Sequence, residues 1–300
     1  MENFALILVA LFIGYLLNAR NVFPKDAPII LNQFILYISL PAMALLQIPK
    51  LSFSYEALIP IAIAWVVMGV SALAIFYVSK LADFSREVTG SLMLVGVLGN
   101  TSFVGIPVIQ AYFGDSALPY VLMYDQLGSF IFLSTYGTFV SVYYSSARDV
   151  DVKAIAKKIV TFPPFLALLL ALLFMGTVFP PLVIGVLSSL ASAIVPLALV
   201  AVGLQLKFRL PANDAKPFAV ALGVKLILAP LVAFGFAQLF SWSDKAALVS
   251  IMESGMGPMI TAGAVASMSG LAPRLSSAIV GYGTLISLFS TWLIFQILLQ

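Results

Sequence analysis

Long apolar segments alternate with short polar loops along the chain. A helix needs about 20 mostly apolar residues to cross the hydrocarbon core of a bilayer. Ten segments meet or approach this length, and the uncharged run 159–206 can hold two of them with a turn at residues 179–181. The pattern predicts an all-α polytopic membrane protein with ten transmembrane helices. The predicted spans are Phe4–Leu17, Ala27–Gln47, Glu56–Val78, Val88–Phe113, Pro119–Tyr144, Phe162–Val178, Pro181–Leu206, Pro217–Phe240, Ala246–Met268 and Ser276–Leu299.

The predicted fourth and ninth helices are interrupted by glycine and proline. The fourth contains the sequence GNTSFVGIP at residues 99–107, and the ninth contains ESGMGP at residues 253–258. Such interruptions leave backbone donors and acceptors that lipid cannot satisfy, so broken segments must face protein or a wet cavity. Broken helices at corresponding places in two halves of a chain indicate the substrate site of a secondary transporter.

The basic residues lie mostly in every second loop. Only Lys50 and Lys245 fall in the loops on one side, and Lys225 lies within a span. Because loops rich in Lys and Arg stay in the cytoplasm, this distribution predicts a multi-pass protein of the cell (inner) membrane with both termini outside. The loops predicted to be cytoplasmic contain Arg20, Lys25, Lys80, Arg86, Arg148, Lys153, Lys157, Lys158, Lys207, Arg209, Lys216 and Arg274.

Five predicted spans precede the basic loop 146–160, and five follow it. An odd number of spans per half inverts the second half, so residues 1–145 and 161–300 are predicted to form two inverted five-helix repeats with crossing fourth and ninth helices. Two echoes favour this arrangement. LPAMAL at 40–45 matches VPLALV at 195–200, and GIPVI at 105–109 matches MGPMI at 256–260, which aligns Pro107 with Pro258.

Composition narrows the available chemistry. The chain is 62% hydrophobic and 9% charged, whereas soluble proteins carry about 25% charged residues. It contains no cysteine and no histidine, which excludes disulfides, imidazole metal sites and catalysis by Ser-His or Cys-His pairs. No Walker motif is present, so ATP coupling within this chain is excluded. We therefore expect no enzyme.

The ten-span plan, the motif at 99–107, the Leu40-Pro41 pair and the TFPP sequence at 161–164 resemble the auxin efflux carrier family of bacterial and plant transporters. The resemblance covers essentially the whole chain. It implies the crossover fold shared with bile-acid/sodium symporters and sodium/proton antiporters, and organic-anion substrates such as auxin, malate or malonate. It also implies a homodimer through a scaffold that includes the second and seventh spans, with the broken helices in a mobile transport subdomain; both subdomains draw helices from both repeats.

Each interruption is predicted to place two half-helix ends at the midplane. N-terminal ends carry about half a positive charge and free N–H donors, so two of them together bind an anion. Pro107 and Pro258 are predicted in the first turns of the second half-helices, where no N–H is needed, and the C-terminal ends are predicted near Asn100 and Met256. The alternative is that the breaks only let two helices cross closely. The predicted substrate-binding residues are Asn100, Thr101, Ser102, Gly105, Pro107, Gly257, Pro258 and Lys225.

Three ionisable residues, Asp125, Lys225 and Glu253, lie inside predicted spans. A charge at the bilayer centre costs about 2.5–3.5 kcal/mol on the insertion scale, so such residues are functional candidates. Glu253 is a cation ligand, a proton carrier or a partner for a positive helix end. ESGM at 253–256 also resembles a sodium-binding motif of the bile-acid symporters, which have amides where this chain has Gly257 and Pro258.

Asp125, with Ser129 one turn further on, is either a proton or sodium site or a hydrated carboxylate in an outward vestibule. Lys225 attracts the substrate carboxylate, pairs with Asp125 or Glu253, or offsets negative helix ends. The predicted ion-coupling residues are Glu253, Asp125, Ser129 and Met256, and the candidate ligands for Na⁺ are Asn100 and Glu253.

The favoured function is a secondary transporter of small organic anions, either auxin-like or mono- and dicarboxylates, that works by alternating access at a midplane crossover site. A cation/proton antiporter of the same fold is an alternative, for which Asp125, Lys225 and Glu253 would suffice. An intramembrane aspartyl hydrolase would need two carboxylates that share a proton, and it leaves the broken helices unexplained. Coupling to Na⁺ or H⁺ and uniport all fit the sequence. The expected partners are the substrate, lipid and a second copy of the chain, and no nucleic acid.

Overall fold

The computed structural model describes residues 2–24, 26–50, 55–145, 161, 163–205 and 214–298. In this part of the chain all regular structure is helical, and no β-strand forms. Five stretches, named at the end of this paragraph, are long and apolar enough to cross a membrane, and Ile7–Ala19 and Thr101–Phe113 are apolar but shorter than a span. The described residues therefore form an all-helical protein with the hydropathy of a membrane protein. The stretches long and apolar enough to cross a membrane are Ala27–Lys50, Tyr55–Leu81, Pro181–Gln205, Ala215–Leu239 and Pro273–Leu298.

Helices lie within each of the five segments predicted as spans in the first half. The second segment is continuous, and the fourth is broken after Val95. The helices of this half are α1 (Glu2–Ala19), α2 (Ala27–Phe34), η1 (Ile35–Ser39), α3 (Leu40–Gln47), η2 (Ile48–Lys50), η3 (Tyr55–Leu58), α4 (Ile59–Leu81), α5 (Arg86–Val95), η4 (Thr101–Gly105), α6 (Ile106–Phe113), η5 (Asp115–Ala117), α7 (Leu118–Met123), η6 (Tyr124–Phe130), η7 (Leu133–Gly137) and α8 (Thr138–Tyr144).

The second half also has helices in each of its five predicted segments. The ninth segment is broken after Ser254, and the helix of the sixth segment ends at Leu173, before the predicted Val178. The predicted basic loop 146–160 and the loop with Lys207 and Arg209 lie outside the described residues. The helices of this half are α10 (Pro163–Leu173), α11 (Pro181–Ser192), α12 (Ile194–Gln205), α13 (Ala215–Gly223), η9 (Val224–Leu228), α14 (Ala229–Leu239), α15 (Lys245–Ser254), α16 (Ile260–Met268) and α17 (Pro273–Leu298).

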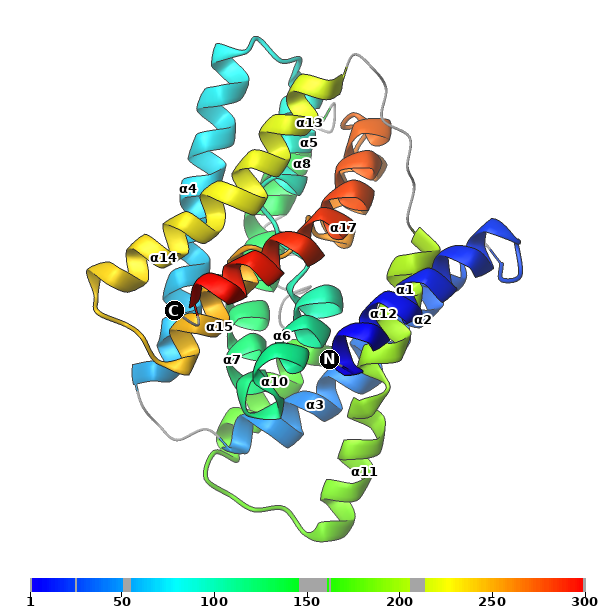
Figure 1. Ribbon diagram of the computed structural model, residues 1–300, viewed down its shortest axis with the longest axis vertical. Coiled ribbons are helices and arrows are strands. Elements are labelled where there is room, and N and C mark those ends of the chain that lie inside the picture. Colours follow the sequence, from blue (N-terminus) through cyan, green and yellow to red (C-terminus); the bar gives the residue numbers. More distant parts are fainter. Residues whose placement is uncertain are drawn as a thin grey trace.

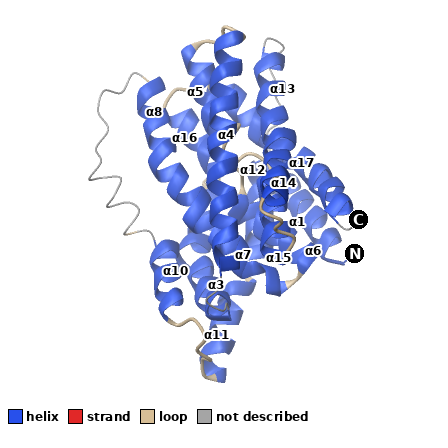
Figure 2. Cartoon of the chain, turned by 90° about the vertical axis from the view of Figure 1, so that its left-hand side faces the viewer, coloured by secondary structure: helices blue, strands red, loops and turns tan. Residues whose placement is uncertain are grey.

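The helices gather in two groups (Figure 1). In the first group, α1 packs along α12, and α3 packs against α10 and α11. In the second group, α4 packs against α14 and α15, and α16 packs against α5 and α17. Figure 2 shows α3, α10 and α11 at one end of the molecule and α5, α8 and α13 at the other. The first broken segment lies where the two groups meet, because η4 contacts α12 and α6 contacts α1.

Three prolines follow π-helical segments at the same spacing. Pro41, Pro107 and Pro230 are each the second residue of the α-helix that continues from η1, η4 and η9, respectively. A proline inside a helix lacks the N–H donor, and its ring clashes with the carbonyl of the preceding turn. The wider π-helical turn lets the helix continue through the proline, so these prolines mark bends within helices and not helix starts.

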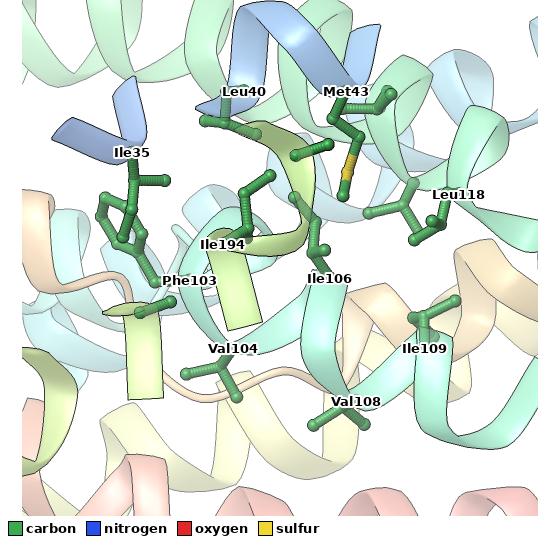
Figure 3. Packing of buried hydrophobic residues seen from close by; sticks show 14 of the residues in the cluster. Ile35, Leu40, Met43, Phe103, Val104, Ile106, Val108, Ile109, Leu118 and Ile194 are labelled. Carbon is green, nitrogen blue, oxygen red and sulfur yellow. The ribbon is translucent and has the colours of Figure 1, made fainter. Parts of the chain in front are cut away.

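A cluster of buried apolar side chains fills the space between the two groups (Figure 3). Phe103, Val104 and Ile106, from η4 and α6, lie in the same cluster as Ile35 and Ile194 from the first group. Burying a large aliphatic side chain contributes about 1.5–3 kcal/mol relative to water. This packing holds the segment after the first break against the first group of helices.

Candidate functional site

The two breaks cross and bind each other through the backbone. The N–H of Asn100 donates to the carbonyl of Gly257 at 2.8 Å, and the N–H of Met259 donates to the carbonyl of Leu98 at 2.9 Å. These two bonds form an antiparallel bridge between Gly99 and Pro258. Each break therefore satisfies backbone groups of the other that lipid would leave unpaired.

The residues that pair at the crossing correct one alignment drawn from the sequence. The bridge places Gly99, and not Pro107, opposite Pro258. Pro107 follows a helical segment that already begins at Thr101, so its predicted place in a first turn is wrong. Pro258 is also not in a first turn, because α16 begins at Ile260. Both prolines had been placed by their usual role at helix starts.

Asn100 begins a helix and does not end one. Its side-chain oxygen accepts a hydrogen bond from the N–H of Phe103 at 3.3 Å, which makes it the N-cap of η4. The predicted helix C-terminal end near Asn100 is therefore wrong, since α5 ends at Val95. The predicted end near Met256 is confirmed, since α15 ends at Ser254 with its C-cap at Gly255. Asparagine is among the preferred N-cap residues because its oxygen satisfies a free N–H of the first turn.

Lys225 lies beneath the crossing and binds a helix end. The residue is 2% exposed, and its ammonium group donates to the carbonyl of Ser254, the last residue of α15, at 2.9 Å. A Cβ atom on Gly99 would lie 2.9 Å from this Nζ, so the missing side chain of Gly99 leaves room for the ammonium group. Of the three predicted roles, this geometry favours the offset of a negative helix end.

Asp125 is joined to the first break by side-chain hydrogen bonds. The hydroxyl groups of Thr101 and Ser102 donate to its Oδ1 at 2.5 and 2.6 Å, and the amide of Gln126 donates to its Oδ2 at 2.5 Å. Asp125 lies in η6 and is 2% exposed. It is buried against the fourth segment, so the predicted alternative of a hydrated carboxylate in a vestibule is wrong.

A cavity of about 130 Å³ opens beside the crossing, between the first break, η6, η7 and the start of α16. Three buried polar atoms of its lining residues have no hydrogen-bond partner among the described residues: Asn100 Nδ2, Gln126 Oε1 and Ser134 Oγ. Buried polar atoms normally have a partner, so each of these needs an explanation such as a ligand or water. The lining residues are Leu36, Asn100, Ser102, Phe103, Asp125, Gln126, Phe130, Leu133, Ser134, Met259 and Thr261.

Glu253 lies in the last turn of α15, away from this cavity lining. The residue is fully buried, and neither of its carboxyl oxygens has a hydrogen-bond partner among the described residues. A Cβ atom on Gly105 would lie 2.5 Å from Glu253 Oε1, so the carboxyl group rests directly against the backbone of the helix that follows the first break. Asp125 and Glu253 share no hydrogen bond, unlike the two carboxylates of an aspartyl hydrolase.

Two larger cavities lie at opposite ends of the first group of helices. One, of about 410 Å³, includes Gln47 at the end of α3, Pro107 and Gln110. The other, of about 510 Å³, includes Pro28 at the start of α2, Gln205 at the end of α12 and Ser267 of α16. They flank the apolar cluster that holds η4 and α6 against the first group.

The structure brings together some of the predicted site residues and separates others. Asn100, Ser102 and Asp125 line the central cavity, and Thr101 lies behind it through its bond to Asp125. The remaining predicted residues do not line it: Gly105, Pro107, Ser129, Lys225, Glu253, Met256, Gly257 and Pro258.

Eight of the eleven lining residues were not among the predicted site residues, and three of these eight have polar side chains: Gln126, Ser134 and Thr261. Thr261 lies in the first turn after the second break, the place that Ser102 takes after the first break, so a polar residue there was a usable signal. Ser134 lies in a π-helical segment, and that change of helical pitch hides which face of the fifth span it occupies.

Known proteins resemble this chain over most of its length. The profile of the membrane transport protein family matches residues 1–295. An uncharacterized transporter of Methanocaldococcus jannaschii is 29% identical over 270 residues, which cover 85% of each chain. An uncharacterized transporter of Methanothermobacter thermautotrophicus is 25% identical over 292 residues, which cover 96% of this chain and 95% of the relative.

Proposed function

Because this chain belongs to the membrane transport protein family, whose auxin efflux carriers its fourth segment resembles, we propose that it is a secondary transporter of small organic anions. The substrate binds by a carboxylate in the cavity beside the crossing. The observation that carries this proposal is the amide of Asn100, which lines the cavity with its nitrogen buried and unpartnered. Family membership shows membrane transport. The organic-anion substrate class rests on the cavity.

The start of α16 supplies the positive end of this carboxylate site. The helix has nine residues, and no side chain caps its first turn. Free N–H groups and the helix dipole favour an anion at such a terminus. Asn100 Nδ2 adds a second donor from the first break, and Thr261 places a hydroxyl group in the lining. Donors from both breaks thus converge on one cavity.

The ten-helix inverted repeat and its membrane orientation are part of the proposal. At the bridge between Gly99 and Pro258, the residue that follows each of them donates a backbone hydrogen bond to the residue that precedes the other. This reciprocal exchange has the pattern of a local two-fold axis. The packing of α1 along α12 is repeated by α10 along α3, as an inverted repeat requires. We place residues 1–145 and 161–300 in the two repeats, with both termini extracytoplasmic.

The position of the cavities supports alternating access as the mechanism in this proposal. The crossing lies between two larger cavities at opposite ends of the first group of helices, and the apolar cluster of Figure 3 separates them. A movement of the second group against the first would connect the crossing to one cavity at a time. In the proposed homodimer the first group is the fixed scaffold, whose α2 and α11 carry exposed apolar residues such as Ile29, Ile30 and Leu182.

Glu253 is the coupling residue in this proposal. A buried carboxylate without a hydrogen-bond partner is costly when ionised, so Glu253 needs a cation, and either H⁺ or Na⁺ meets that need. The two candidate Na⁺ ligands do not meet in the central cavity, because Asn100 lines it and Glu253 does not. The lack of hydrogen-bond partners for Glu253 among the described residues also favours the second candidate function, a cation/proton antiporter.

A thermal-shift screen of the purified protein tests the proposed function. Carboxylates, indoles and amines are each added with and without Na⁺. A ligand that binds the folded state at 100 times its Kd raises the stability by about 2.7 kcal/mol, so carboxylates should raise the melting temperature. If no carboxylate does so and Na⁺ or a change of pH alone does, the antiporter takes its place.

A further inference from the structure

From the charges around the central cavity we infer that its substrate carries an ammonium group as well as a carboxylate, as a small amino acid does. This inference rests on the carboxylate site proposed above and replaces the simple anion with a zwitterion. It concerns three further lining residues of the cavity, Asp125, Gln126 and Ser134.

Asp125 brings a carboxyl group to the cavity lining, and in its ionised form this group has no cation among the described residues to balance its charge. Two hydroxyl groups and one amide donate to its carboxylate, an arrangement that suits the ionised form. It forms no ion pair among the described residues, and the ammonium group of Lys225 is held by the carbonyl of Ser254. A cation that enters the cavity would balance this charge.

This charge selects against a simple anion. At an effective dielectric constant of about 20, two like unit charges about 5 Å apart disfavour binding by roughly 100-fold or more. The same distance favours an opposite charge by a similar factor. A substrate that places a carboxylate at Asn100 and a cation at Asp125 turns the repulsion into an attraction.

The free acceptors match the three donors of an ammonium group. Oδ2 of Asp125 accepts only one hydrogen bond in the structure, from Gln126, which leaves a lone pair for the substrate. Gln126 Oε1 and Ser134 Oγ are buried and have no partner among the described residues. The lining residues thus offer one carboxylate oxygen, one amide oxygen and one hydroxyl oxygen for further hydrogen bonds.

The size and walls of the cavity limit the rest of the substrate. The volume is about 130 Å³, and Leu36, Phe103 and Leu133 supply apolar walls. A small aliphatic side chain fits this space, whereas an indole ring would fill or exceed it. The cavity therefore suits an amino acid of the size of alanine.

Four probes of nearly equal size distinguish binding of the carboxylate at Asn100 from binding of the ammonium group at Asp125. They are L-alanine, L-lactate, propionate and ethylamine. Binding of each to the full-length protein in detergent is measured by calorimetry, with and without Na⁺ and at two pH values. We expect alanine to bind at least about 10-fold more tightly than propionate and ethylamine. Propionate binding that equals alanine binding, or that requires Na⁺ or low pH, overturns the amino-acid inference and leaves the carboxylate site standing. Ethylamine binding that equals alanine binding, or no binding of any probe, overturns the carboxylate site as well.

Two variants sharpen this test. Asp125→Asn keeps the shape of the side chain, and it should weaken alanine binding at least about 10-fold while propionate binds as well as before or more tightly. Ser134→Ala should weaken alanine more than propionate, and it serves as the second variant if Asp125→Asn does not fold. Gln110→Ala, in the larger cavity near α3, is the matched control. An unchanged ratio of alanine to propionate affinity in a folded Asp125→Asn protein contradicts the inference, and so does the same unchanged ratio in Ser134→Ala.

Discussion

The two breaks meet at one bridge but carry different kinds of residues. The first break supplies polar side chains: Asn100 caps η4, and Thr101 and Ser102 bind Asp125. The second break supplies backbone groups and close packing, because Gly257 and Pro258 touch α17. At this crossing the first break presents polar side chains, and the second break lets the helices approach closely.

The two buried carboxylates differ in the same way. Among the described residues, Asp125 receives three hydrogen bonds and Glu253 receives none. Asp125 lines the central cavity, whereas Glu253 lies against the backbone of Gly105. A carboxylate fixed by donors keeps one position and one charge, as a recognition group must. A carboxylate without partners changes its charge or its cation at little structural cost, as a coupling group must.

Filling the space at the second break should have the largest effect on stability. A Cβ atom on Gly257 would lie 2.9 Å from the Cα of Thr284 and 3.0 Å from the carbonyl oxygen of Gly283. Overpacking against backbone costs about 1–3 kcal/mol or more, so Gly257→Val should lower the melting temperature strongly. Gly235→Val is the control, since its Cβ would meet no atom within 4 Å. Equal melting temperatures for the two variants would show that the second break is not closely packed.

Removing a donor at the first break should cost somewhat less. Thr101→Val keeps the shape of the side chain and deletes its hydrogen bond to Asp125. Hydrogen bonds to charged groups contribute about 1.5–3 kcal/mol, and the loss should show in thermal unfolding. Thr291→Val, which deletes a hydroxyl bond to a neutral carbonyl in α17, is the matched control and should cost about 1 kcal/mol. A smaller loss in Thr101→Val than in the control would remove Asp125 from the role given to it.

Lys225→Met tests the link between the crossing and the end of α15. The variant keeps the apolar stem and leaves the carbonyl of Ser254 without the ammonium donor. An unsatisfied buried acceptor costs about 1–3 kcal/mol. We expect this loss in thermal unfolding, together with unchanged binding affinity for carboxylates, because Lys225 does not line the cavity. A loss of carboxylate affinity with normal stability would return Lys225 to the substrate site.

Glu253→Gln should have the smallest effect on stability. The carboxyl group has no hydrogen bond to lose among the described residues, so the free energy of unfolding should change less than in the three variants above. Transport in proteoliposomes should lose its dependence on the coupling cation, either Na⁺ or H⁺. Retained dependence on both ions would take Glu253 out of the coupling mechanism.

The sequence predicted much of this fold from simple patterns. Apolar length located the ten helical segments, and glycine with proline located the two breaks. The register at the crossing could not be read, because proline fits both a helix start and a π-helical bend, and Pro107 lies in the latter. The bonds from Thr101 and Ser102 to Asp125 join residues of different spans, and no local pattern specifies such a contact. Thr261 was missed although its place in the first turn after the second break was a signal, and Ser134 was missed because the π-helical pitch hides its face.

The central claim is that a carboxylate binds at the amide of Asn100 beside the crossing, and Asn100→Asp tests it most directly. The variant keeps the side-chain shape and the oxygen that caps η4, but it replaces the donor with a second negative charge. Binding of L-alanine and propionate is measured by calorimetry, with the melting temperature as the check on folding. The account predicts that the ligand that binds the wild-type protein, L-alanine or propionate, binds a folded variant roughly 100-fold or more weakly than it binds the wild-type protein. Unchanged affinity in a folded Asn100→Asp protein would contradict it.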